Sequence, residues 1–179
     1  MKTTQILIAG FGGQGILFSG KFLAYKGLVE ELQVSWLPSY GPEMRGGTAN
    51  CNVILSDSPV GSPIITVPDV LIAMNLPSLQ KYVDTVAPGG QIYVDSSLIA
   101  AKVERTDVEV FYVPATQMAK DEGISSLANM IIIGSLLENH PELSFEGTEE
   151  VVEKLVPPKK AALKELNMKA LNLGKNYKG

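Results

Sequence analysis

The sequence predicts an α/β protein with a Rossmann-like, mostly parallel sheet flanked by helices, followed by a helical C-terminal extension. An apolar strand at residues 4–9 runs directly into a glycine-rich turn and then into a helix. A continuous apolar run at residues 70–74 is typical of a parallel strand that is buried on both faces. The apolar periodicity alternates between strand and helix up to residue 123 and is helical from residue 125 onwards.

The α/β part is expected to contain six strands. A helix that starts at Ile16 follows the first strand, and Gly20 and Ala24 allow this helix to approach the sheet closely. The remaining strands are predicted at residues 34–37, 49–55, 70–74, 91–95 and 108–113. A crossover helix at residues 79–86 is expected to end at Pro88-Gly89-Gly90.

The C-terminal part is expected to be helical, with helices beginning near Ser125 and covering residues 148–155 and 157–175. Residues 127–137 are too apolar for a surface helix, so we expect them in the core or at an interface. If they lie at an interface, the isolated chain is expected to form a homodimer. Because no linker divides the chain, we expect one domain over residues 1–179. It comprises an α/β core at 1–123 and the helical extension at 125–179.

Composition and charge limit the classes of function. The chain has 179 residues, of which 45% are hydrophobic and 19% charged, and its net charge of −4 argues against nucleic acid as a partner. The C-terminal lysines are better explained by a solvated helix than by nucleic-acid binding. No apolar run approaches the ~20 residues of a membrane span, and Met1 leads into a strand rather than a signal sequence. We therefore expect a cytoplasmic protein without a membrane partner.

The chain has one cysteine, Cys51, and one histidine, His140. A single cysteine forms no internal disulfide and does not hold an iron–sulfur cluster by itself. Cys51 lies in an apolar strand-like run, which favours a buried side chain over a nucleophile. His140 precedes a proline and is expected at a helix end or on the surface. These two residues leave little scope for a zinc site or a catalytic triad.

The glycine-rich turn reads Gly10-Phe11-Gly12-Gly13-Gln14-Gly15 and fits the dinucleotide fingerprint G-x-G-x-x-G. It offers backbone N–H groups at a helix N-terminus, where a phosphate or other anion binds favourably. The alternative is a tight turn that serves only close helix packing, and the sequence leaves both open. Residues 34–39 supply neither an acid for a ribose nor a base for a 2′-phosphate, which disfavours a conventional nicotinamide site.

A second unusual segment, residues 39–48, follows the second strand and reads SYGPEMRGGT. Arg45 is the only basic residue between Lys26 and Lys81, and a lone guanidinium suits a carboxylate, a phosphate or an acidic group of a partner. The alternative is an internal pair with Glu43 or Asp57. The two segments supply the predicted cofactor-binding residues: Gly10, Gly12, Gly13, Gln14, Gly15, Ser39, Tyr40, Gly41, Glu43, Arg45, Gly46 and Gly47. No residue is predicted to be catalytic or to bind a metal.

Two further segments, Asn75-Leu76-Pro77 and Asp95-Ser96-Ser97, each follow a predicted strand. They are candidates for the walls of the same crevice, because ligands of open α/β sheets bind beyond the carboxyl ends of the strands. Helix capping explains Ser78 and Ser96 equally well.

Together, the glycine-rich turn and the 39–48 segment resemble the gamma subunit of 2-oxoacid:ferredoxin oxidoreductases. The resemblance covers essentially the whole chain, including Ser56-Asp57, Ser62-Pro63 and residues 129–134. The Tyr-Gly-Pro-Glu-Met-Arg-Gly-Gly version of the second motif is most similar to the 2-oxoglutarate and branched-chain 2-oxoacid members.

The resemblance implies a subunit that is inactive alone. The whole enzyme converts a 2-oxoacid and coenzyme A to acyl-CoA, CO2 and reduced ferredoxin. Thiamine diphosphate, magnesium and iron–sulfur clusters are expected on alpha, beta and delta partner subunits, and ferredoxin is met through the complex. The gamma subunit would contribute to assembly and to the access of coenzyme A, the co-substrate. Two alternatives remain: the smaller subunit of indolepyruvate ferredoxin oxidoreductase, and a free-standing nucleotide-binding Rossmann-like protein.

Overall fold

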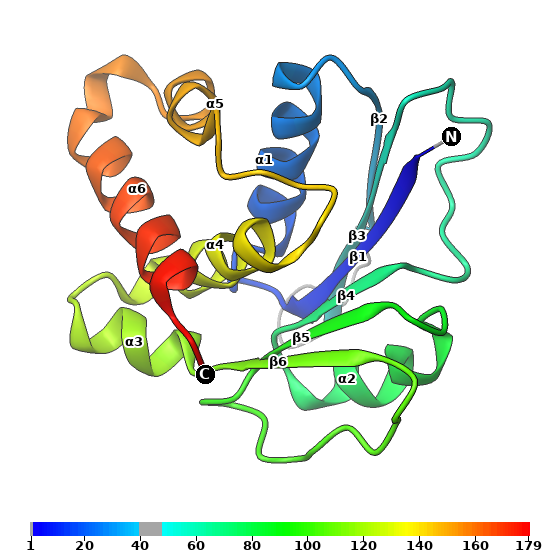
Figure 1. Ribbon diagram of the computed structural model, residues 1–179. Coiled ribbons are helices and arrows are strands. Elements are labelled where there is room, and N and C mark those ends of the chain that lie inside the picture. The colour runs from blue at the N-terminus through cyan, green and yellow to red at the C-terminus, as the bar shows by residue number, and fades with distance from the viewer. Residues whose placement is uncertain (1, 40–47) are drawn as a thin grey trace.

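The chain folds around one six-stranded sheet with the strand order β2-β3-β1-β4-β5-β6 (Figure 1). The computed structural model describes residues 2–39 and 48–179. Strands β1, β4, β5 and β6 are parallel neighbours, whereas β3 pairs antiparallel with both β1 and β2. The predicted α/β fold with a mostly parallel sheet is therefore confirmed, with β3 as the reversed strand. The strands are β1 (Thr3–Phe11), β2 (Gln33–Ser39), β3 (Thr48–Ser56), β4 (Val70–Ala73), β5 (Gln91–Asp95) and β6 (Glu109–Val113).

Helices cover the two faces of the sheet unequally. Figure 1 shows α2 on one side of the sheet and the other helices on the opposite side. Alternate residues of β1 serve the two cores: Ile6 and Ile8 face the larger helical layer, and Leu7 packs in the smaller core beside α2. The helices are α1 (Ile16–Val29), α2 (Leu76–Tyr82), α3 (Ala115–Asp121), α4 (Ala128–Asn139), α5 (Thr148–Leu155) and α6 (Ala161–Asn176).

The crossover helix begins three residues earlier than predicted. Asn75 caps α2, because its side-chain oxygen accepts a hydrogen bond from the backbone N–H of Ser78 at 2.8 Å. The cap is therefore Asn75, and the alternative of capping by Ser78 does not hold. The α-helix ends at Tyr82, and the rest of the predicted span is the 3₁₀ turn Val83–Thr85.

Helix α3 was not predicted. It follows Pro114 directly, and tertiary contacts fix its first turn: the backbone N–H and the hydroxyl of Thr116 donate to Asp95 at 3.3 and 2.5 Å. Because both bonds join residues that are far apart in the sequence, the apolar pattern of this short segment does not reveal the helix.

Helix α4 contains the very apolar segment and lies in the core. Residues 130–137 of this helix are all buried. It packs closely against α6, because Gly134 and Gly174 bring the two backbones together: a Cβ atom at Gly174 would lie 1.7 Å from the carbonyl oxygen of Ile131. The core alternative is therefore correct, and the chain's own helices cover the apolar surface that suggested a homodimer.

The C-terminal lysines form ion pairs on the surface. Lys154 lies 2.8 Å from Glu150, Lys164 lies 3.1 Å from Glu149, and Lys169 joins α6 to Glu122 at 2.8 Å. Within the described parts of the chain, no helix has both the length and the apolar character needed to cross a bilayer.

Candidate functional site

The two glycine-rich motifs meet at one edge of the sheet. Phe11, the last residue of β1, pairs with Thr48, the first residue of β3. Ser39, the last residue of β2, pairs with Asn50, which in turn pairs with Ala9 on the other side of β3. Both ends of the second motif are thus anchored beside the glycine-rich turn. The other predicted residues of that motif lie outside the described residues: Tyr40, Gly41, Glu43, Arg45, Gly46 and Gly47.

At this edge, the helices that follow the neighbouring strands β1 and β4 leave toward opposite faces of the sheet. Helix α1, which follows β1, packs in the larger helical layer, and α2, which follows β4, packs on the opposite face. In open α/β sheets such a reversal opens a crevice beyond the carboxyl ends of the two strands. Here the crevice lies between the glycine-rich turn and the Met74–Asn75 segment.

Gln14 bridges the two walls of this crevice. Its side-chain Oε1 accepts from the backbone N–H of Phe11 at 2.6 Å, and its Nε2 donates to the carbonyl oxygen of Met74 at 2.9 Å. A Cβ atom at Gly10 would lie 2.6 Å from Gln14 Oε1 and 2.8 Å from the Cβ atom of Met74. The chain's own side chains therefore fill the space beside Gly10.

Gly15 serves the packing of α4 onto the start of α1. It has a positive φ of 74°, and an added Cβ atom would lie 2.5 Å from the side-chain nitrogen of Asn129. That nitrogen donates to the carbonyl oxygen of Gly15 at 3.1 Å and to the hydroxyl of Ser19 at 3.0 Å. Asn129 is therefore a residue of this site that was not predicted as such, because the contact joins residues 114 positions apart.

The tip of the glycine-rich turn is not packed against other described parts of the chain. Gly13 has a φ of 93°, and among the described residues no atom beyond its two chain neighbours lies within 4 Å of the position that its Cβ atom would occupy. Among the described residues, no side chain caps the first turn of α1. Close packing thus explains Gly10 and Gly15, whereas Gly13 and the N-terminus of α1 leave room for an anion.

The other two segments predicted for the crevice reach the same edge, but their polar groups have internal roles. Asn75 is 2% exposed and caps α2. Asp95 is fully buried and accepts hydrogen bonds from Ser97 and Thr116. Ser96 lines a cavity of about 490 Å³ that lies between β6 and the C-terminal residues.

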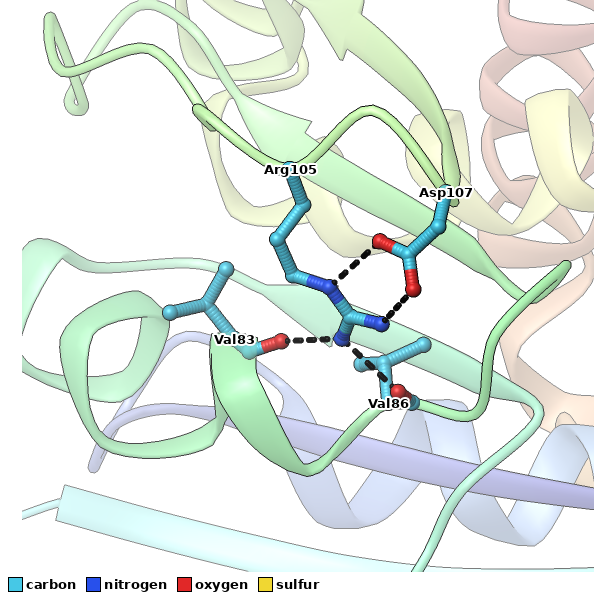
Figure 2. A network of polar contacts seen from close by, with 4 residues as sticks. All are labelled: Val83, Val86, Arg105 and Asp107. Atoms are coloured by element: carbon cyan, nitrogen blue, oxygen red, sulfur yellow. Dashed lines mark hydrogen bonds and ion pairs between the residues drawn. The ribbon is translucent and has the colours of Figure 1, made fainter.

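Arg105 is held by a network of hydrogen bonds with Asp107, Val83 and Val86, none of which belongs to the glycine-rich motifs (Figure 2). Its Nε and one terminal nitrogen donate to the two carboxylate oxygens of Asp107 at 2.9 and 2.7 Å. Its other terminal nitrogen donates to the carbonyl oxygens of Val83 and Val86 at 2.9 and 2.7 Å. The hydrogen bonds from Arg105 lower the pKa of Asp107. Arg105 is therefore structural, and Arg45 is the other arginine of the sequence.

Cys51 and His140 do not form a catalytic site. Cys51 is buried, its thiol points to the carbonyl oxygen of Ile16 at 3.4 Å, and burial raises its pKa to about 12. His140 ends α4, where its Nδ1 accepts from the backbone N–H of Glu142 at 3.2 Å, and burial lowers its pKa. Within residues 2–39 and 48–179, no three His, Cys, Asp or Glu side chains are grouped to hold a metal ion.

Asp57, a possible internal partner of Arg45 in the sequence, has a backbone partner in the structure. Its carboxylate accepts from the backbone N–H of Lys2 at 2.8 Å, and this hydrogen bond lowers the pKa of the carboxyl group. Asp57 lies just after β3, at the end of that strand opposite Thr48. Asp57 and the glycine-rich turn therefore lie at opposite ends of the strands.

Comparison with known proteins gives a match to the family described as pyruvate ferredoxin/flavodoxin oxidoreductase over residues 5–177. The 2-oxoglutarate synthase subunit KorC of Methanothermobacter marburgensis is 35% identical over 178 residues, covering 96% of this chain and 94% of the relative. The ketoisovalerate oxidoreductase subunit VorA of Methanothermobacter thermautotrophicus is 38% identical over 174 residues, which is 97% of this chain. The chain spans 36% of that relative. The indolepyruvate oxidoreductase subunit IorB of Archaeoglobus fulgidus is 26% identical over 192 residues.

Solved structures give the same result. The gamma subunit of a keto/oxoacid ferredoxin oxidoreductase from Geobacter sulfurreducens has a TM-score of 0.79 and 30% identity, with 96% of this chain and 95% of that chain covered. The 2-oxoglutarate:ferredoxin oxidoreductase of Magnetococcus marinus, solved with 2-oxoglutarate, coenzyme A and succinyl-CoA bound, has a TM-score of 0.88 and 27% identity. The match covers 98% of this chain and 31% of that chain. The chain therefore belongs to the pyruvate ferredoxin/flavodoxin oxidoreductase family, as its two glycine-rich motifs predicted.

Proposed function

We propose that this chain is the gamma subunit of a multi-subunit 2-oxoacid:ferredoxin oxidoreductase and that it is inactive alone. The observation that carries the proposal is the match to KorC over nearly the full length of both chains. The 2-oxoglutarate and branched-chain 2-oxoacids are the substrate classes that the KorC and VorA relatives name. The complete enzyme would convert such an acid and coenzyme A to acyl-CoA and CO2, with electrons passed to ferredoxin.

The redox and decarboxylation chemistry is assigned to alpha, beta and delta partner subunits. Thiamine diphosphate, magnesium and iron–sulfur clusters would be bound there, and ferredoxin would meet the complex rather than this chain. The single cysteine of this sequence supports that division, because a cluster ligated by cysteine needs several thiolates and Cys51 is buried with a raised pKa. The role left to this chain is assembly and the access of coenzyme A.

The residues proposed to meet coenzyme A or a partner subunit are the 39–48 segment, above all Arg45, and the tip of the glycine-rich turn. Three observations support them: both motifs are anchored at one edge of the sheet, no described residue packs over Gly13 beyond its chain neighbours, and a relative of the same fold was solved with coenzyme A bound. A guanidinium and a helix N-terminus are both suited to phosphate groups. Gln14, Gly10 and Gly15 would shape this edge through their packing.

The test is co-expression of the chain with the subunits encoded beside it, followed by an assay of 2-oxoacid-dependent and coenzyme A-dependent electron transfer. The chain alone is expected to be inactive. Arg45→Ala should raise the apparent KM for coenzyme A about 10-fold or more, the effect of losing a hydrogen bond to a charged group, or weaken assembly. Lys159→Ala, an exposed residue before α6, is the control. Wild-type values of KM and assembly in Arg45→Ala would refute this role for Arg45.

The two alternatives give different results in the same assay. An indolepyruvate oxidoreductase would have one partner gene instead of several and would use an aryl 2-oxoacid. A free-standing nucleotide-binding protein would be stabilised against heat by NAD(H), NADP(H) or ATP without partners. The packing of Gln14 beside Gly10 argues against a dinucleotide close to this turn.

A further inference from the structure

The edge strand β2 has no charged residue. Its sequence is QVSWLPS, and its neighbour β3, TANCNVILS, also has none. Natural sheets usually protect an exposed edge with charged side chains, especially lysine, or with proline, because an unprotected edge invites association; β2 has Pro38 but no charge. Trp36 and Leu37 of β2 are 37% and 38% exposed. An uncharged edge strand with two exposed large apolar side chains is therefore a surface that another protein is expected to cover.

At the outer strands β2 and β3, no long helix covers the face of the sheet that is opposite to α1. Leu37 pairs with Asn52, which pairs with Leu7, so these three residues lie on the α2 face of the sheet. Helix α2 packs against β1 and β4 and reaches β3 through Tyr82, whose hydroxyl accepts from Asn50 at 3.3 Å. Figure 1 shows α2 beneath β4–β6 and away from β2.

The exposed part of this face combines apolar side chains with neutral polar ones. Leu37 and Phe11 are 38% and 40% exposed, and both lie on the α2 face. We call this region the β2–β3 surface, defined by Phe11, Ser35, Leu37, Thr48, Asn50 and Asn52. The cores of protein–protein interfaces have this composition: they are depleted of charge and enriched in large apolar side chains.

The relatives indicate which protein covers this surface. In the Magnetococcus marinus enzyme and in VorA, the region that matches this chain makes up 31% and 36% of a longer polypeptide. In those relatives the same fold is part of one polypeptide with further protein, which holds the two close together. In the proposed function the neighbour is a separate subunit, since KorC is covered by this chain over 94% of its length. A permanent neighbour would cover an edge strand that has Pro38 as its protection but no charged side chain.

We propose that the β2–β3 surface binds the partner subunit that corresponds to the remaining part of the fused relatives. This inference rests on the proposed function and specifies where the assembly contact lies. The facing surface of the partner would be apolar and uncharged, because a charge placed against Leu37 and Phe11 would lose its hydration without gaining a counter-ion. Asn50, Asn52 and Ser35 would supply hydrogen bonds around the apolar contact.

The test compares two leucines of equal exposure in the co-expressed complex. Leu37 on the β2–β3 surface and Leu163 on α6 are both 38% exposed. Leu37→Glu is expected to weaken assembly about 30-fold or more, as substitution of a central interface residue does. Leu163→Glu should leave assembly unchanged, and Leu37→Met should assemble as the wild type does. Thermal unfolding of each isolated variant establishes that it is folded, and hydrogen exchange should show that residues 33–39 and 48–52 become protected upon assembly.

Each other outcome has one meaning. If the wild-type chain binds no partner subunit, the proposed function is overturned, and with it the inference that rests on it. If the wild-type chain assembles and a folded Leu37→Glu variant assembles equally well, the inference about the surface is wrong. If the isolated chain is a dimer that Leu37→Glu converts to a monomer, the occupant is a second copy of this chain, which also overturns the proposal.

Discussion

At the scale of single residues, Gln14 lies in a nucleotide-binding fingerprint, but its side chain forms hydrogen bonds within the protein. Its side chain satisfies one donor on the glycine-rich turn and one acceptor at the end of β4. It therefore joins the two walls of the crevice and occupies space between them that a bound nucleotide would need. The amide is suited to this position because it donates and accepts at once, which neither a carboxylate nor an ammonium group does.

Replacing this amide by a carboxyl group should make stability depend on pH. In Gln14→Glu the ionised side chain still accepts from Phe11 but faces the carbonyl oxygen of Met74 without a proton to donate. We expect the free energy of unfolding to fall by about 1 kcal/mol at pH 8, because the position is half-buried and the lost hydrogen bond is only partly replaced by water. Because the contact disfavours the charged form, the pKa of the introduced carboxyl group is raised in the folded state. The loss is therefore smallest at low pH and grows as the pH rises through that value.

Urea unfolding at pH 5 and pH 8 measures this effect, with Gln80→Glu as the control. Gln80 lies on the exposed side of α2, where a carboxylate is hydrated. The difference between the two variants should be larger at pH 8 than at pH 5. Equal losses for both variants at both values would show that the bridge to Met74 does not stabilise the fold.

The residue scale also shows where sequence reasoning stops. The glycine spacing and the strand before it sufficed to predict the turn, because these are local requirements of a tight βα connection. The contact between Asn129 and Gly15 joins residues 114 positions apart and depends on how α4 crosses α1. No local pattern specifies that crossing, so the packing role of Gly15 was left open until the fold was known.

At the scale of elements, the contact between α4 and α6 sets the arrangement of the helical layer. A Cβ atom at Gly134 would lie 2.0 Å from the carbonyl oxygen of Leu171, and one at Gly174 would lie 1.7 Å from that of Ile131. Each glycine thus admits the backbone of the opposite helix. The apolar character of residues 127–137 predicted burial, but it did not identify α6 as the covering element, because α6 has a mixed composition.

Gly174→Ala should separate these helices and lower the free energy of unfolding by about 3 kcal/mol or more, since backbone atoms have little freedom to move aside. The gain in helix propensity, about 1 kcal/mol, is too small to compensate. Gly61→Ala is the control: Gly61 has open space around its Cβ position, so its change should stay within about 0.5 kcal/mol. Chemical denaturation measures both values. A neutral or stabilising Gly174→Ala variant would contradict the close approach of the two backbones.

The elements also differ in how well their patterns revealed them. Strand β5 and helix α5 have the predicted bounds. The first is a short, largely apolar run and the second an amphipathic one, and residues typical of turns lie on both sides of each. Helix α3 escaped prediction because its first turn is tied to Asp95 on β5. Strand β2 extends to Ser39 despite Pro38, since an edge strand tolerates a missing N–H group.

At the scale of the whole molecule, charge is distributed unevenly over the surface. The C-terminal helices carry exposed lysine and glutamate pairs, whereas the β2 and β3 strands carry no charge. The first pattern suits a surface in contact with water and the second a surface in contact with protein. This asymmetry is consistent with a subunit whose helical side faces outward in the complex and whose β2 edge faces inward.

Cys51 offers a direct measure of whether the molecule unfolds as one unit. It lies on β3 with its side chain against Gly20 of α1, and burial raises its pKa to about 12, so the thiol stays protonated at pH 8. We therefore expect a disulfide reagent to label the native chain only through unfolding. The labelling rate should rise with urea and in Gly174→Ala, because that variant destabilises the same core. Leu37→Glu should leave the rate near that of the wild type, since Leu37 is on the opposite face of the sheet from Cys51. Rapid, complete labelling of the native wild-type chain would show that α1 opens separately from the rest of the sheet.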